Sequence, residues 1–126
     1  MTVPVEVLFV DDDPFNMLLA KRIFKKLNKQ DAVQFVHNGE EALEWWRGAG
    51  RQLPALVLLD VNMPVLGGFE MLNRMLEEGA HFQHTNIILM ISTAMEKRWT
   101  EEKSYHTISG TIERPLTEEA IQRLLH

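Results

Sequence analysis

The stretch LVLLDVNMP, residues 56–64, contains four consecutive apolar residues that are followed at once by the carboxylate of Asp60. The apolar run has neither a helical nor an alternating period, so it predicts a strand that is buried on both faces, as in a parallel sheet. Asp60 would then lie at the carboxyl end of a central strand, where open α/β sheets bind their ligands. Pro64 directs the chain out of the sheet into a loop. On this stretch alone, Asp60 could equally cap a turn, because Asp and Pro both favour turns.

The length and composition of the chain indicate one domain. A chain of 126 residues can bury about two thirds of its unfolded surface, so we expect a single domain over residues 1–126 that folds without disulfides. The absence of cysteine excludes thiol chemistry and cysteine-ligated zinc. A formal net charge of −5 argues against binding to nucleic acid or to an anionic membrane surface, because both require clustered positive charge.

The sequence shows no sign of a membrane or secretory segment. No apolar run approaches the length of a membrane span, and Met1 to Glu6 carry no signal pattern. We therefore expect a cytoplasmic protein. The chain ends at His126 without an output domain, which favours a stand-alone protein, although a fragment of a larger protein would look the same.

Strands and helices are predicted to alternate along the whole chain. The first strand, residues 6–10, leads directly into three aspartates, and Pro14 suits the first turn of a helix that should end near Asn28. The other predicted strands are residues 33–37, 56–59, 86–92 and 110–114. The other predicted helices are residues 40–49, 69–78, 95–106 and a final helix capped by Thr117. Five strands that alternate with five helices predict a doubly wound parallel α/β fold.

The predicted helices differ in how their apolar residues are spaced. Trp45 and Trp46 belong to a pattern at i, i+3, i+4 and i+7, so we expect them in the core or half-buried. In the helix over residues 69–78, the inward-facing residues are predicted to be Phe69, Leu72 and Leu76. Residues 95–106 contain few apolar residues, which indicates a loosely packed helix or an interaction surface.

Polar side chains follow several of the predicted strands. Because the carboxyl ends of parallel strands share one edge of the sheet, the side chains expected to converge there are those of Asp11, Asp12, Asp60, Ser92 and Arg114. Three carboxylates repel one another unless a cation such as Mg²⁺ neutralises them. A carboxylate beside Mg²⁺ can attack phosphorus to form an aspartyl phosphate, and a hydroxyl and a guanidinium can then donate hydrogen bonds to the phosphoryl oxygens. Singly, each residue has a simpler interpretation, such as a helix cap, a strand end or a surface charge.

Four motifs together resemble the receiver domain of bacterial response regulators, the CheY-like family. They are VDDDP at 10–14, LLDVNMPVLGG at 58–68, the strand that ends in Ser92, and ERP at 113–115. The resemblance covers essentially the whole chain and implies a five-stranded flavodoxin-like fold with strand order 2-1-3-4-5. It also implies that Asp60 receives a phosphoryl group from a phosphohistidine on a sensor histidine kinase or a phosphotransfer protein. The domain would be a signalling switch and would catalyse at most its own phosphorylation and dephosphorylation.

The resemblance implies a role for each of the other site residues. Asp11 and Asp12 match the acid pair that binds Mg²⁺ with Asp60, and the backbone carbonyl of Asn62 completes the protein ligands. Ser92 matches the hydroxyl switch residue. The family's output surface corresponds to residues 95–125, where we expect a downstream protein partner to bind. The resemblance further implies a cis peptide bond between Arg114 and Pro115.

Some positions depart from the family pattern. Arg114 stands where the family has lysine, and a planar guanidinium on a longer side chain is not equivalent to an ammonium at a tight site. Thr111 stands where the family usually has an aromatic residue that moves inward on activation. Thr93 is bulkier than the family's usual small residue, and Ala94 lacks the polar group that commonly assists dephosphorylation.

These departures leave an alternative open, a degenerate receiver that binds a partner without phosphotransfer. The intact set of three aspartates argues against that alternative. A phosphatase of the haloacid dehalogenase type would also phosphorylate an aspartate after a strand. That family requires a second aspartate two residues later, where this chain has Asn62.

Overall fold

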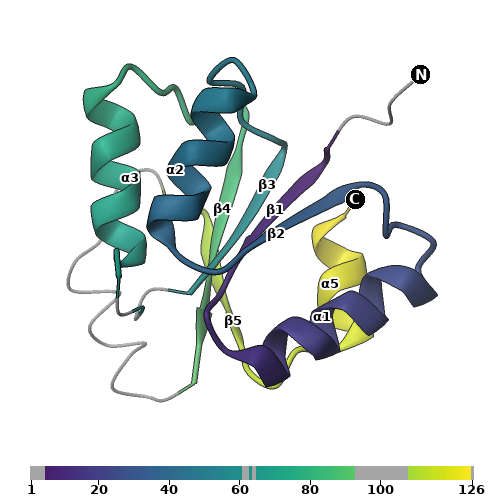
Figure 1. Cartoon of the computed structure of the whole chain (residues 1–126). Helices are drawn as coiled ribbons and strands as arrows, with labels where there is room; N and C mark the ends of the chain where they lie inside the picture. Colours follow the sequence, from purple (N-terminus) through teal and green to yellow (C-terminus); the bar gives the residue numbers. More distant parts are fainter. Residues whose placement is uncertain (1–4, 61–62, 64, 93–107, 126) are drawn as a thin grey trace.

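The computed structural model describes residues 5–60, 63, 65–92 and 108–125. In this part of the chain, five strands form one parallel sheet with the order β2-β1-β3-β4-β5, which confirms the expected order (Figure 1). The strands are β1 (Val7–Val10), β2 (Val33–Val36), β3 (Leu56–Asp60), β4 (Asn86–Ile91) and β5 (Gly110–Glu113). The described helices are α1 (Pro14–Lys26), α2 (Gly39–Gly48), α3 (Gly68–Glu77) and α5 (Glu118–Leu124). The helix expected over residues 95–106 lies outside the described residues.

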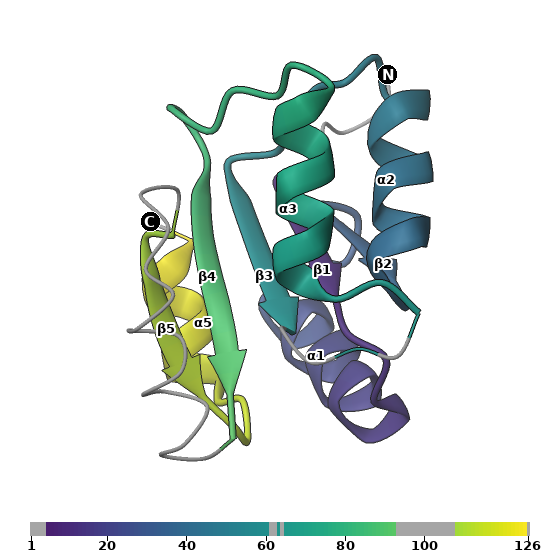
Figure 2. The same ribbon diagram turned by 90° about the vertical axis from the view of Figure 1, so that its left-hand side faces the viewer.

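The sheet separates two layers of helices, with α2 and α3 on one face and α1 and α5 on the other (Figures 1 and 2). Side chains along a strand point alternately to the two faces. In β3, Val57 and Leu59 therefore join the core under α2 and α3, whereas Leu56 and Leu58 join the core under α1 and α5. This double burial explains why β3 and most of β4 are unbroken apolar runs.

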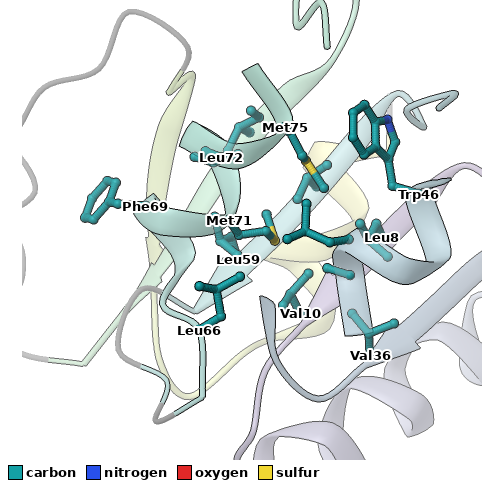
Figure 3. Packing of buried hydrophobic residues seen from close by; sticks show 14 of the residues in the cluster. Leu8, Val10, Val36, Trp46, Leu59, Leu66, Phe69, Met71, Leu72 and Met75 are labelled. Carbon is teal, nitrogen blue, oxygen red and sulfur yellow. The ribbon is translucent and has the colours of Figure 1, made fainter. Parts of the chain in front are cut away.

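The core under α2 and α3 contains the side chain of Trp46, the largest that is fully buried among the described residues (Figure 3). Trp46 is fully buried and Trp45 packs against the same cluster while partly exposed, as predicted. In α3, by contrast, the expectation for Leu76 is wrong, because this side chain is 42% exposed. At about 100° per residue, the buried stripe of α3 is centred on Met71, Leu72 and Met75, and Leu76 falls at its edge in the last turn.

The helix starts follow the capping residues in the sequence. The Asp13 side chain accepts a hydrogen bond from the amide of Phe15, and Pro14 is the first residue of α1. The Thr117 hydroxyl accepts a hydrogen bond from the amide of Ala120, as expected for the cap of α5. Such caps satisfy amides that have no partner inside the helix. The two caps therefore set the residues at which α1 and α5 begin, next to the sheet edge where the aspartates lie.

The start of α3 packs closely against the end of β3. A Cβ atom at Gly68 would lie 2.8 Å from the carbonyl oxygen of Asp60 and 3.0 Å from a side-chain carbon of Leu59. Only glycine permits this approach, because real Cβ atoms essentially never come so close to other heavy atoms. Gly68 therefore allows the first turn of α3 to lie directly beside Asp60.

Within the described residues, no helix is both long and apolar enough to cross a lipid bilayer.

Candidate functional site

The register of the parallel strands brings the predicted site residues to one edge of the sheet. Val10 pairs with Leu59, so Asp11 follows β1 beside the end of β3, where Asp60 lies. On the other side of β3, Ile91 pairs with Glu113. Ser92 directly follows β4 and Arg114 directly follows β5. The Arg114 amide donates a hydrogen bond to the carbonyl of Ile91 (2.9 Å). The positions predicted from separate motifs are thus neighbours in space.

Three carboxylates form a compact cluster at this edge. Asp11, Asp12 and Asp60 each offer one carboxylate oxygen, and these oxygens all lie within 4.8 Å of one another. Asp11 is fully buried and Asp60 is 4% exposed, whereas Asp12 is exposed. The cluster therefore has two carboxylates in the protein interior and one that faces solvent.

Arg114 reaches into the cluster from the end of β5. Its Nη2 lies 2.9 Å from Oδ2 of Asp11 and 3.3 Å from Oδ1 of Asp60. Its Nη1 donates a hydrogen bond to Oγ of Ser92 at 3.1 Å. One guanidinium thus links two carboxylates and the hydroxyl, and the peptide bond that follows, Arg114–Pro115, is cis as predicted.

The environment of Arg114 stabilises its charged form. Burial lowers the pKa of the guanidinium, but the charges of Asp11 and Asp60 and hydrogen bonds to both outweigh burial and raise the pKa above its usual value. The side chain of Arg114 is 18% exposed. Arg114 therefore remains a cation throughout the accessible pH range.

Asn16 holds Asp11 in place, and sequence reasoning missed this residue. The buried Asn16 side-chain amide donates to Oδ2 of Asp11, and the Asp13 amide donates to Oδ1 of Asp11 at 2.9 Å. Asn16 shares the buried face of α1 with Ala20 and Ile23, at i, i+4 and i+7. A polar residue on an otherwise apolar helix face was the available signal.

The chemistry of the donors fits a divalent cation. Three carboxylates this close together repel one another when ionised, and a divalent cation would reduce that repulsion. Carboxylate oxygens are ligands that Mg²⁺ prefers. The other predicted ligand, Asn62, lies outside the described residues, as do Pro64, Thr93 and Ala94.

Comparisons with known proteins show the family to which the chain belongs. The family model for the response regulator receiver domain matches residues 7–126. The chain is 27% identical over 123 residues to the probable methanogenesis regulatory protein FilR2 of Methanothrix harundinacea, an alignment that covers 95% of this chain and 78% of that protein. It is 30% identical over 119 residues to the 3',5'-cyclic-nucleotide phosphodiesterase regA of Dictyostelium discoideum, which covers 94% of this chain but only 14% of that protein.

A solved structure shares the fold. A two component response regulator from Cytophaga hutchinsonii superposes with a TM-score of 0.79 at 20% identity, covering 98% of this chain and 95% of that chain. At this identity the likeness concerns the fold. The family model, in contrast, spans almost the entire sequence, including every predicted site residue. The chain therefore belongs to the response regulator receiver domain family.

Proposed function

We propose that this receiver domain accepts a phosphoryl group on Asp60 from a phosphohistidine of a sensor histidine kinase or a phosphotransfer protein, and that a protein partner reads the resulting change. The observation that carries the proposal is the position of Asp60. Asp60 is the last residue of the central strand β3, its carboxylate lies within 4.8 Å of those of Asp11 and Asp12, and it contacts Arg114. Members of the response regulator family interact with histidine kinases or phosphotransfer proteins.

The transfer is a displacement at phosphorus. A carboxylate oxygen of Asp60 forms the new O–P bond, the P–N bond of the phosphohistidine breaks, and its electron pair stays on the imidazole nitrogen. Asp11, Asp12 and Asp60, together with the carbonyl of Asn62, would hold Mg²⁺, which neutralises negative charge where the phosphoryl group arrives.

Arg114 and Ser92 would bind the product. A phosphoryl group on Asp60 adds negative charge beside the guanidinium of Arg114, which lies 3.3 Å from Asp60 before transfer. Charge-assisted hydrogen bonds to phosphoryl oxygens are strong, so Arg114 would exchange carboxylate contacts for phosphoryl contacts. The Ser92 hydroxyl, held by Arg114, can donate to a phosphoryl oxygen in the same step. This exchange would couple phosphorylation to the ends of β4 and β5.

The proposal extends to the setting of the domain. We propose that residues 1–126 form one receiver domain, that it acts in the cytoplasm, and that its downstream partner binds residues 95–125. Of that surface, the structure describes residues 108–125, which comprise β5 and α5. The net charge of −5 favours a protein partner over nucleic acid.

Intact mass spectrometry tests the acceptor directly. After incubation with phosphoramidate or acetyl phosphate and Mg²⁺, the wild type should gain the mass of one phosphoryl group, and Asp60→Asn should gain none. Asp31→Asn is the matched control, because Asp31 is exposed and precedes β2 at the opposite edge of the sheet. Comparable labelling of Asp60→Asn would refute the assignment, and an unlabelled wild type would favour a degenerate receiver.

A further inference from the structure

One nitrogen of Arg114 occupies the space between two buried carboxylates. Nη2 lies within hydrogen-bonding distance of Oδ2 of Asp11 (2.9 Å) and near Oδ1 of Asp60 (3.3 Å). A metal ion coordinated by both carboxylates needs oxygens of the same two groups. Since the ion and the guanidinium are both positive, each also weakens the binding of the other by repulsion.

The oxygens of Asp11 are already used as hydrogen-bond acceptors. Oδ1 accepts from the amide of Asp13, and Oδ2 accepts from both Asn16 and Arg114. Asp13 and Asn16 follow Asp11 closely in the chain and are held by the start of α1. Arg114, in contrast, is a long side chain from the end of another strand. Of the three donors, Arg114 can therefore leave Asp11 with the least rearrangement of the backbone.

Arg114 has an alternative contact within reach. Its Nη1 already donates to Ser92, which is exposed at the same edge. Among the described residues, its buried Nε has no hydrogen-bond partner, so the present position does not satisfy all of its donors. A shift of the guanidinium toward Ser92 would release Asp11 and Asp60 while keeping one of its hydrogen bonds.

We propose that Arg114 is an internal counter-ion that competes with a divalent metal ion for Asp11 and Asp60, so that metal binding requires the guanidinium to move away from these carboxylates. The inference rests on the proposed function in one respect, that the ion is the one used at the phosphoacceptor site. It predicts weak metal binding in the wild type. It also makes Arg114 the residue that sets the metal concentration at which the site becomes competent.

The test is isothermal titration calorimetry with Mg²⁺, without any phosphodonor. The key variant is Arg114→Met, because methionine removes the charge and does not coordinate Mg²⁺. We expect this variant to bind Mg²⁺ about tenfold more tightly than the wild type, within the range typical of coupling between two binding events. The Mg²⁺ affinity of Arg114→Lys should lie between those of the wild type and Arg114→Met. Lysine keeps the positive charge, but its ammonium on a shorter side chain replaces a planar group that contacts both carboxylates.

A matched control removes another paired arginine. Arg47→Met breaks an ion pair with Glu78 between α2 and α3 and should leave the dissociation constant for Mg²⁺ unchanged. Equal Mg²⁺ affinity of the wild type and Arg114→Met, or weaker binding by the variant, would overturn the competition while leaving phosphotransfer to Asp60 untouched. Absence of Mg²⁺ binding by both proteins would overturn the competition and the proposed metal site together.

A second measurement does not depend on the folding of Arg114→Met. In nitrogen–proton NMR spectra of the wild type, the Nε–H signal of Arg114 is identified by its absence from the Arg114→Lys spectrum. This signal should shift with added Mg²⁺, with the same midpoint as the calorimetric titration. An Nε–H signal that stays in place while Mg²⁺ binds would show that the guanidinium does not move, and would refute the inference.

Discussion

The guanidinium of Arg114 and the carboxylate of Asp11 form an ion pair at 2.9 Å although they are 103 positions apart in the sequence. The pair joins the end of β5 to the end of β1, with β3 and β4 between them in the sheet. At this point a guanidinium contacts a fully buried carboxylate of the acidic cluster. The stability of the fold and the proposed metal binding and phosphoryl transfer would therefore depend on the same few atoms.

Arg114→Met should destabilise the metal-free protein. The change removes the guanidinium that pairs with Asp11 and Asp60, and we expect a loss of about 2 kcal/mol in the free energy of unfolding. This is below the value for a fully buried pair, because the Arg114 side chain is 18% exposed. Urea denaturation in EDTA measures the loss. Saturating Mg²⁺ should reduce the difference in free energy of unfolding between the variant and the wild type. A difference that Mg²⁺ leaves unchanged would contradict this prediction.

Asn16→Ala should weaken the fold through Asp11. The substitution removes a buried donor to a charged acceptor, and such hydrogen bonds contribute about 2 kcal/mol. Thermal unfolding of this variant should be compared with that of Asn73→Ala, which changes an exposed residue of α3 in the same way. Equal losses in the two variants would indicate that helix propensity alone is responsible.

The response to phosphorylation should depend on Ser92 rather than on Thr111. Thr111 is an exposed residue of β5 and cannot replace an aromatic ring that moves inward. Ser92, in contrast, accepts a hydrogen bond from Arg114. In backbone NMR spectra after phosphoramidate treatment, Ser92→Ala should lose most of the shifts at β5 and α5, and Thr111→Ala should keep them. The reverse pattern would refute this route.

The phosphorylated form should be long-lived for a receiver domain. Hydrolysis needs a water in line with phosphorus, and Ala94, which lies outside the described residues, offers no group to orient it. Ala94→Glu should speed loss of the phosphoryl group about tenfold, equivalent to about 1.4 kcal/mol of barrier. The decay is followed by intact mass in excess Mg²⁺. An unchanged decay would mean that this side chain does not limit hydrolysis.

Glu78 should contribute to stability in a defined pH range. A hydrogen bond from Arg47 is the main cause that lowers the pKa of Glu78 from 4.5 to about 2, with Arg51 adding to it. Because the folded-state pKa is the lower one, the contribution is complete above the unfolded value of 4.5 and is lost as the pH falls toward 2. Denaturation midpoints of wild type and Glu78→Gln should converge over this interval. A constant difference down to pH 2 would contradict the assignment.

The residue patterns were sufficient to predict a parallel sheet and the residues that would gather at its edge, whereas the order of the strands came from the family resemblance. Unbroken apolar runs identify strands that are buried on both faces. Because parallel strands end at the same edge of a sheet, Asp60, Ser92 and Arg114 come together independently of how the helices pack. The start of α1 at Pro14 and the cap of α5 at Thr117 were also predictable, because their local hydrogen bonds involve adjacent residues.

The contacts inside the site were not predictable in the same way. Strand register places Arg114 at the edge, but the reach of its side chain decides that Nη2 meets both Asp11 and Asp60. Asn16 depends on the rotation of α1 about its axis, which is fixed by packing across the whole face. The exposure of Leu76 has a similar cause, because periodicity gives the direction of a helix face only to within the width of its buried stripe.

The close approach of Gly68 to the carbonyl of Asp60 makes the proposed phosphoacceptor sensitive to a residue that has no reactive side chain. Even a methyl group at position 68 would clash with the end of β3 and push α3 away from it. The displacement would be passed to the peptide group of Asp60, and from there to the direction in which its carboxylate faces an incoming donor. A genetic screen for signalling defects would therefore identify Gly68→Ala together with substitutions of the aspartates. The variant would resemble one that lacks a reactive group, although its defect is a misaligned Asp60 carboxylate.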